Sequence, residues 1–177
     1  MNNVMLDIET LGTKPGSVVL SIGAVYFDPD DGIGAEFYRE IALESSQAVG
    51  MTIDADTLRW WLAEGKEGAL RSILNGGNDP LLDVLLALTA WFNSSGRGNP
   101  AKVQVWGCGA GFDQVLVKDA YARVGLPVPW QFWNERCFRT LKALRPDIQA
   151  ERVNNHNALS DARNQAEHAC RLLRALR

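Results

Sequence analysis

The segment Asn3–Glu9, with the sequence NVMLDIE, decides the fold class because its apolar and polar residues alternate. This alternation predicts a β-strand with one apolar face. Asp7 and Glu9 lie on the opposite face, because residues two apart on a strand point the same way. Two carboxylates that close repel each other unless a cation lies between them or one is protonated. An edge strand with a solvated acidic face is the alternative interpretation of this pair.

Further strands are predicted outward from this segment. Ser17–Phe27 is rich in Val and Ile and ends at the turn sequence DPDDG of Asp28–Gly32. Ala35–Ile41 follows as the third strand, so the chain is expected to open with an antiparallel meander. Lys102–Trp106 is predicted to be a further, short and buried strand.

Helical patterns fill most of the remaining sequence. Asp54 or Asp56 is suited to cap a helix that runs through Leu62. The other predicted helices are Glu67–Leu74, Pro80–Phe92, a segment that follows a glycine-rich turn and ends at Val124, Arg136–Leu144 and Ala158–Leu176. Strands first, then helices around a later strand, predict an α/β fold with a mixed central sheet flanked by helices.

Composition narrows the class of protein. The chain has 177 residues and a formal net charge of -3, and at about 150 residues per domain a single domain over residues 1–177 is expected. Three widely spaced cysteines, no basic-then-apolar leader and no bilayer-spanning apolar stretch predict a reduced, cytoplasmic protein without a membrane partner. Acidic side chains predominate in residues 1–117 and basic ones in residues 118–177. This asymmetry fits either solvated helix faces or an acidic, cation-attracting site flanked by basic helices for a polyanion.

Asp113 lies at a predicted junction between a strand and a helix. It ends the glycine-rich sequence WGCGAGFD of Trp106–Asp113, which places it at the carboxyl end of a strand. This is the usual crevice position in open α/β sheets. The glycines do not form a nucleotide P-loop, because no Lys-Ser or Lys-Thr pair follows them. Taken alone, Asp113 also fits a residue that only favours the helix dipole.

The third candidate is the sequence HNALSD of His156–Asp161. Asp161 falls in the first turn of the last predicted helix, and His156 lies five residues earlier in an Asn-rich loop. A polar loop is not the environment of a core histidine, so His156 is a candidate general base. His168, the other histidine of the chain, is predicted to be a surface residue of the helix.

Together these residues form an ordered set that resembles the DEDD (DnaQ-like) superfamily of 3′-5′ exonucleases, in its His-containing branch. The resemblance runs from Met5 through Ala169. Thr57–Trp61, Trp106–Asp113 and Arg139–Leu141 are most similar to the Rv2179c-like group, which includes phage exonuclease A and the exonuclease VIII type. A ribonuclease H-like fold is implied by this resemblance.

The resemblance also implies roles for the five residues of the set. It assigns the general base to His156. It assigns metal binding to Asp7, Glu9, Asp113 and Asp161. Four carboxylates suit two Mg²⁺ or Mn²⁺ ions, because these hard cations prefer oxygen ligands. Two such ions would stabilise both the attacking and the leaving oxygen of an in-line displacement. Because bound cations offset the acidic charge, nucleic-acid binding is predicted to depend on metal.

Substrate contacts are implied by the same resemblance. The backbone of Thr10, Leu11 and Gly12 is expected to contact the terminal 3′-hydroxyl, with the side chain of Leu11 wedged beside the last base. Phe112 is a candidate stacking platform, and a core role is an equal alternative.

Trp60 and Trp61 are adjacent, so on a helix their side chains point in different directions. Of Trp60 and Trp61, one is expected in the core and the other at the substrate cleft or a subunit contact. Cys108 and Gln114 depart from the family, which has Asn more often at both positions.

The predicted function is a 3′-5′ exonuclease that releases nucleoside 5′-monophosphates from single-stranded DNA or 3′ overhangs. The nearest alternative is the same chemistry on RNA, because no residue can be assigned to reading a 2′-hydroxyl. A non-catalytic module that binds a nucleic-acid end or a partner is the third hypothesis, and the intact set of acids and base argues against it. The related groups include dimers, so a second copy of the chain is a candidate partner.

Overall fold

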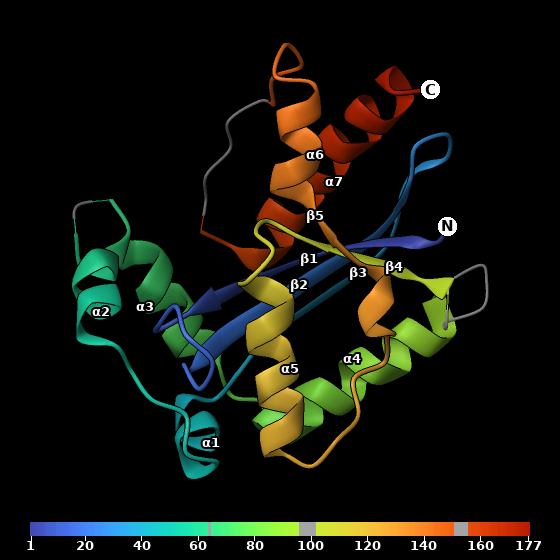
Figure 1. Ribbon diagram of the computed structural model, residues 1–177. Helices are drawn as coiled ribbons and strands as arrows, with labels where there is room; N and C mark the ends of the chain where they lie inside the picture. The colour runs from blue at the N-terminus through green and yellow to red at the C-terminus, as the bar shows by residue number, and fades with distance from the viewer. Residues whose placement is uncertain (64, 96–101, 151–155) are drawn as a thin grey trace.

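The structure, a computed structural model, describes residues 1–63, 65–95, 102–150 and 156–177. Its centre is a five-stranded sheet in the order β3-β2-β1-β4-β5 (Figure 1). The strands are β1 (Asn3–Thr10), β2 (Val19–Asp28), β3 (Gly32–Glu40), β4 (Gln104–Gly107) and β5 (Glu135–Cys137). β2 pairs antiparallel with β1 and β3, whereas β4 pairs in parallel with β1 and β5. The predicted antiparallel meander within a mixed sheet is therefore confirmed.

Two short helices, Leu43–Ala48 and Phe132–Asn134, were not predicted from the sequence, and the others follow the predicted pattern with different ends. The helices are α1 (Leu43–Ala48), α2 (Ala55–Trp61), α3 (Glu67–Gly76), α4 (Leu81–Ser95), α5 (Asp113–Arg123), the short 3₁₀ helix η2 (Phe132–Asn134), α6 (Phe138–Leu144) and α7 (Ala158–Ala175). Asp54 is the cap of α2, because its carboxylate accepts from the backbone of Asp56 and Thr57. No helix in the described part of the chain is long and apolar enough to cross a membrane.

The start predicted for the helix Arg136–Leu144 is wrong. Arg136 and Cys137 belong to β5 and pair with Trp106 and Gly107 of β4, and α6 begins only at Phe138. Three residues are too few to show an alternating pattern. Their conformation is set by hydrogen bonding to β4, which adds a parallel edge strand to the sheet.

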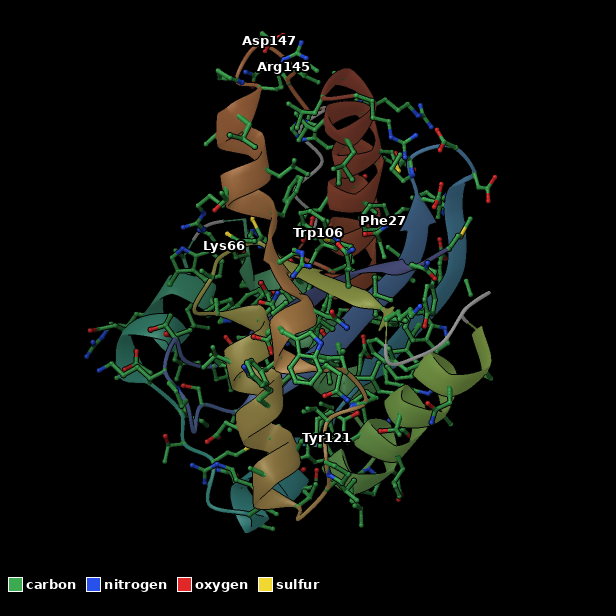
Figure 2. All side chains as sticks on the ribbon, turned by 45° about the vertical axis from the view of Figure 1, so that its right-hand side comes forward. Phe27, Lys66, Trp106, Tyr121, Arg145 and Asp147 are labelled. Atoms are coloured by element: carbon green, nitrogen blue, oxygen red, sulfur yellow. The ribbon has the colours of Figure 1, made fainter. Side chains whose placement is uncertain are left out.

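Two apolar layers cover the two faces of the sheet. Figure 1 shows α4 and α5 on one side and α6 and α7 on the other. Leu6 of β1 faces the larger cluster on the side of α4 and α5, whereas Met5 faces the smaller cluster beneath α6 and α7. Phe27 and Trp106, labelled in Figure 2, belong to this smaller cluster, and their ring centroids lie 6.3 Å apart.

The position of β1 in the sheet decides where its acidic pair faces. β1 has a hydrogen-bonded strand on each side, and Glu9 is buried. Because Asp7 and Glu9 share a face with Met5, they point to the side on which α7 packs. The alternative interpretation, an edge strand with a solvated acidic face, is therefore wrong.

A glycine allows α7 to approach the sheet closely. Gly23 of β2 is the register partner of Asp7 in β1. A Cβ atom at Gly23 would lie 2.2 Å from the carbonyl carbon of Ala158, where α7 begins. The first turn of α7 therefore sits directly over the strand pair that carries the acids.

The prediction that His168 is a surface residue is wrong. Its side chain is 4% exposed, and its ring packs edge-on against Phe138 with centroids 5.5 Å apart. Its Nε2 lies 2.8 Å from the carbonyl oxygen of Ile148, so the Nε2–H donates to this oxygen. His168 is buried because α6 and the turn after it cover this side of α7. This burial lowers the pKa of His168.

Candidate active site

Three of the predicted metal-binding acids meet at the end of β1. Asp7 and Glu9 come from the strand, and Asp161 comes from the first turn of α7. One carboxylate oxygen from each lies within 4.8 Å of the others. In Figure 1 the beginnings of α5 and α7 both lie beside the arrowhead of β1. The meeting of these acids follows from the packing of α7 over β1 and β2.

Asp113 joins the same cavity from the beginning of α5. It is buried, and its Oδ2 accepts a hydrogen bond of 2.8 Å from the backbone N–H of Cys108. The cavity has a volume of about 330 Å³, and its lining includes Asp7, Glu9, Asp113, His156 and Asp161. The structure thus brings together all five residues of the predicted catalytic set.

Burial and mutual repulsion disfavour the ionised form of the four carboxylates in this cavity. Burial, followed by repulsion from Asp113 and Glu9, raises the pKa of Asp7 well above its usual value. Burial and the charges of Asp161 and Asp113 raise the pKa of Glu9 to about 8. Burial also raises the pKa of Asp113 to about 6 and increases that of Asp161. A divalent cation would favour the ionised form of all four groups.

Gln165 is a site residue that the sequence analysis missed. It lies four residues after Asp161 on α7 and lines the same cavity. Its Nε2 donates a hydrogen bond of 2.7 Å to Oδ1 of Asp7. The spacing of four from Asp161 is the signal that points to it, because residues at this spacing share a helix face.

His156 lies beside the acids, between them and α2. Its backbone φ is 47°, in the left-handed region. The side-chain ring packs edge-on against Trp60 and Trp61, with centroid distances of 5.2 and 5.5 Å. Asn157, the next residue, caps α7 by accepting from the backbone of Ser160.

A second cavity of about 560 Å³ adjoins the first and shares Glu9 and Phe112 with it. Its lining also includes Thr10, Lys14 and Trp60. Phe112 is half-buried, borders both cavities and also packs against the larger apolar cluster. Both predicted roles of Phe112 therefore have a structural basis.

The predicted substrate segment is held by its own hydrogen bonds. The Thr10 hydroxyl donates to the carbonyl of Gly12 over 2.7 Å, and the carbonyl of Thr10 accepts from Nε1 of Trp61 over 2.8 Å. Leu11 packs in the core and does not line either cavity. The Leu11 side chain is therefore not in a position to wedge beside a base, contrary to the prediction from the sequence.

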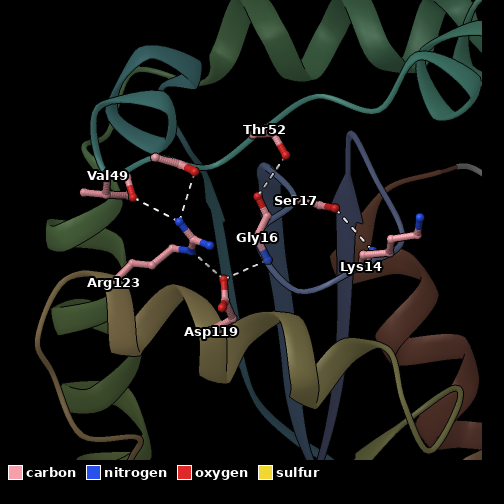
Figure 3. A network of polar contacts seen from close by, with 8 residues as sticks. Lys14, Gly16, Ser17, Val49, Thr52, Asp119 and Arg123 are labelled. Carbon is pink, nitrogen blue, oxygen red and sulfur yellow. Dashed lines mark hydrogen bonds and ion pairs between the residues drawn. The ribbon is translucent and has the colours of Figure 1, made fainter.

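The loop after this segment is anchored to α5, as Figure 3 shows. Asp119 accepts from the backbone N–H of Gly16 over 2.9 Å and from Nε of Arg123 over 2.6 Å. Arg123 also donates to the carbonyls of Val49 and Gly50. These bonds fix the loop between β1 and β2 and so hold the wall of the second cavity.

Gln114 and Cys108, the two departures from the family pattern, have different surroundings. Gln114 is buried, and its Nε2 donates to the carbonyls of Val105 in β4 and Arg136 in β5. It therefore bridges two strands. Cys108 lines the acidic cavity, and its backbone N–H donates to Oδ2 of Asp113.

Comparison with known proteins places this site in a family. Residues 2–173 match the family described as the 3′-5′ exoribonuclease Rv2179c-like domain. The chain belongs to the Rv2179c-like family. The predicted resemblance is thereby confirmed, and this Rv2179c-like chain is a 3′-5′ exonuclease, a hydrolase of phosphodiester bonds.

Solved structures share the fold of this Rv2179c-like chain. The nuclease domain of 3'hExo, a DEDDh family member bound to rAMP, has a TM-score of 0.65 at 13% identity, covering 98% of this chain and 92% of that chain. Exonuclease X in complex with 5′ overhanging duplex DNA has a TM-score of 0.59 at 15% identity, covering 98% and 92%. S. pombe Pop2p in its Mg²⁺- and Mn²⁺-bound form has a TM-score of 0.63 at 13% identity, covering 96% and 82%. The likeness confirms the ribonuclease H-like α/β fold. A comparison with curated protein sequences found no match.

Proposed function

We propose that this chain is a metal-dependent exonuclease that releases nucleoside 5′-monophosphates from the 3′ end of single-stranded DNA or of a 3′ overhang. The observation that carries the proposal is the convergence of Asp7, Glu9 and Asp161 within 4.8 Å. Asp113 and His156 line the same cavity. This combination of clustered carboxylates and a neighbouring imidazole is suited to activate water for attack on a phosphodiester.

The donor set of the cavity fits divalent cations. It offers carboxylate oxygens, which Mg²⁺ and Mn²⁺ prefer, and their raised pKa values reflect burial and mutual repulsion. The residues that would hold the metal are Asp7, Glu9, Asp113 and Asp161, and four carboxylates suit two ions. When bound, the cations supply electrostatic stabilisation of the negative charge that develops on the phosphate oxygens.

The chain's own side chains supply the proton transfer and the orientation of the phosphate. His156 is the proposed general base, which takes a proton from the attacking water at one of its ring nitrogens. Arg139 lines the cavity and donates to the carbonyl of Cys108 over 3.1 Å. Its guanidinium is suited to a non-bridging phosphate oxygen.

The second cavity is the proposed site of the terminal nucleotide. Its volume of about 560 Å³ lies in the range of small-molecule sites. Thr10 lies on one wall and Phe112 on the border with the acids. We assign the contact with the 3′-hydroxyl to the backbone near Thr10 and Gly12, and we withdraw the wedge role of the Leu11 side chain because that side chain is buried.

RNA is the second candidate substrate. The family description names an exoribonuclease domain, and this favours the predicted alternative of the same chemistry on RNA. Matched deoxyribo- and ribo-oligonucleotides of one sequence, compared side by side, distinguish the two. Preferential cleavage of the ribo-oligonucleotide would replace single-stranded DNA in the proposal.

The decisive experiment is degradation of 5′-labelled single strands, 3′ overhangs and blunt duplexes with Mg²⁺ or Mn²⁺. We expect shortening from the 3′ end, and a fall on the order of 10²-fold or more for Asp7→Asn and Asp113→Asn, because each removes charge from the metal-binding set. Asp147→Asn is the matched control, since Asp147 pairs with Arg145 at the surface and should retain activity. Full activity of Asp7→Asn, or in excess chelator, would contradict the proposal.

A further inference from the structure

The imidazole of His156 is half-buried and packs against two indole rings. It stands nearly perpendicular to the ring of Trp60, at 87°, and at 71° to that of Trp61. The two indoles are themselves packed edge to face, with centroids 5.1 Å apart and an angle of 76°. All three rings therefore adopt the edge-on arrangement that aromatic pairs prefer.

The backbone of His156 needs external support for its conformation. Among the described residues, it is the one non-glycine residue with a positive φ. A side chain with a Cβ disfavours this region, so contacts elsewhere must compensate for the strain. The contacts of the His156 ring with Trp60 and Trp61 can stabilise this strained backbone conformation.

The tryptophan pair is itself anchored to the active-site strand. Nε1 of Trp61 donates to the carbonyl of Thr10 over 2.8 Å. At the other end of α2, the backbone N–H of Asp54 donates to the carbonyl of Leu11 over 2.7 Å. Both bonds end on the segment that follows the acidic pair of β1. α2 is thus fixed relative to the carboxylates, and a ring held by α2 is fixed relative to them too.

We propose that Trp60 and Trp61 are positioning residues that hold the imidazole of His156 beside the acidic cavity. This inference rests on the proposed role of His156 as the base. The tryptophans do not take part in the proton transfer; they restrict the rotation of the imidazole and its backbone. Because Trp61 also binds the carbonyl of Thr10, the same pair connects the substrate segment with the base.

The two tryptophans differ in how cleanly they can be tested. Trp61 is 1% exposed and belongs to the core, so its replacement risks unfolding. Trp60 is 44% exposed, and Nζ of Lys66 lies 4.9 Å from its ring centroid. Trp60 can therefore be changed with the fold preserved, and it is the position to vary.

The first measurement is spectroscopic and does not depend on activity. The chain has two histidines, so an NMR spectrum of the labelled protein contains two sets of imidazole ring signals, which His156→Gln assigns. Indole ring currents should displace the His156 signal from its position in an unfolded peptide. Trp60→Leu should move it back towards that position, whereas Trp60→Phe should retain most of the displacement.

The second measurement is kinetic, on a single-stranded oligonucleotide with Mg²⁺. Trp60→Leu should lower kcat by about 10- to 100-fold, less than the 10²–10⁴-fold attributed to a general base. Because Trp60 also lines the cavity proposed for the terminal nucleotide, kcat at saturating substrate, and not KM, is the quantity that tests the positioning role. Trp60→Phe should retain more of kcat than Trp60→Leu. Trp133→Leu is the control, because Trp133 is an exposed aromatic (61%) outside both cavities, and it should behave as the wild type.

Each result has a defined meaning. A His156 signal that Trp60→Leu does not move overturns the proposal, as does a Trp60→Leu variant with unchanged kcat. An increase in KM alone would also overturn it and make Trp60 a substrate contact. Full activity of His156→Gln would show that His156 is not the general base. The tryptophans would then have no base to position. The spectroscopic result would still show whether the pair holds the ring, so the two failures are distinguishable.

Discussion

Gln165 donates a hydrogen bond of 2.7 Å from Nε2 to Oδ1 of Asp7, and this bond joins α7 to β1 at the centre of the acidic cavity. A neutral donor favours the ionised carboxylate, so the bond lowers the pKa of Asp7 against the opposing effect of burial. Oε1 of Gln165 is buried without a hydrogen-bond partner in the described part of the chain. The amide is therefore oriented by Asp7, and it orients Asp7 in turn.

Replacement of Gln165 should weaken metal binding. We expect Gln165→Leu to lower Mn²⁺ affinity by about 10- to 100-fold, the usual effect of losing a group that orients a metal ligand. Isothermal titration calorimetry with Mn²⁺ measures this without substrate. Gln47→Leu, at an exposed position of α1, is the control and should bind normally. Equal affinities in both variants would show that Gln165 does not position Asp7.

Neutralising Asp7 should stabilise the metal-free protein, although it lowers activity in the presence of metal on the order of 10²-fold or more. Burial and the charges of Asp113 and Glu9 oppose ionisation of Asp7, so at neutral pH Asp7→Asn removes a repulsion that the native state bears. We expect the Tm in excess chelator to rise by a few degrees, equivalent to about 1 kcal/mol or more. Mg²⁺ should raise the Tm of the wild type more than that of the variant. A lower Tm for metal-free Asp7→Asn than for the wild type would contradict this.

His168 should make stability fall in mild acid. Burial, the largest cause, lowers its pKa below that in the unfolded chain, so the unfolded state binds the proton more readily. The contribution of His168 is therefore present above its unfolded pKa of about 6.5 and is lost as the pH falls through its lower native pKa. Urea unfolding at pH 7.5, 6.5 and 5.5 measures this. His168→Gln retains a donor for the Ile148 carbonyl and should flatten the dependence; an identical pH dependence in both proteins would refute the assignment.

Gly23→Ala should displace α7 and impair the site more than the fold. The new Cβ would lie 2.2–2.3 Å from backbone atoms of Ala158 and Leu159, so the first turn of α7 must shift and carry Asp161 with it. We expect a loss of about 1–3 kcal/mol of stability and a fall of about 10-fold or more in kcat, since small displacements of catalytic groups are costly. Urea unfolding and initial rates measure the two effects.

Gly68→Ala is the matched control for this substitution. Gly68 lies in α3 with nothing within 4 Å of its would-be Cβ. Alanine there should be neutral or stabilising by about 0.5–1 kcal/mol, because glycine is unfavourable in helices. A Gly23→Ala variant with the activity and stability of Gly68→Ala would show that α7 is not held at the proposed distance.

The local sequence pattern by itself determined most strands and helices of this protein and the strand face on which the acidic pair lies. Alternation in Asn3–Glu9 predicted β1 and placed Asp7 and Glu9 on one face, because side-chain direction on a strand follows from spacing alone. The meander and most helices followed in the same way. The order of acids and base along the chain was enough to indicate the exonuclease family that the comparison confirmed.

Only the tertiary structure decided the contacts between segments far apart in the chain. β5 exists because β4 offers it hydrogen bonds, and His168 is buried because α6 packs over it. The bond between Gln165 and Asp7 joins residues 158 positions apart. Such a contact depends on how α7 crosses β1 and β2 over Gly23, and that packing is set by close approach of backbones and burial of apolar surface rather than by any local periodicity.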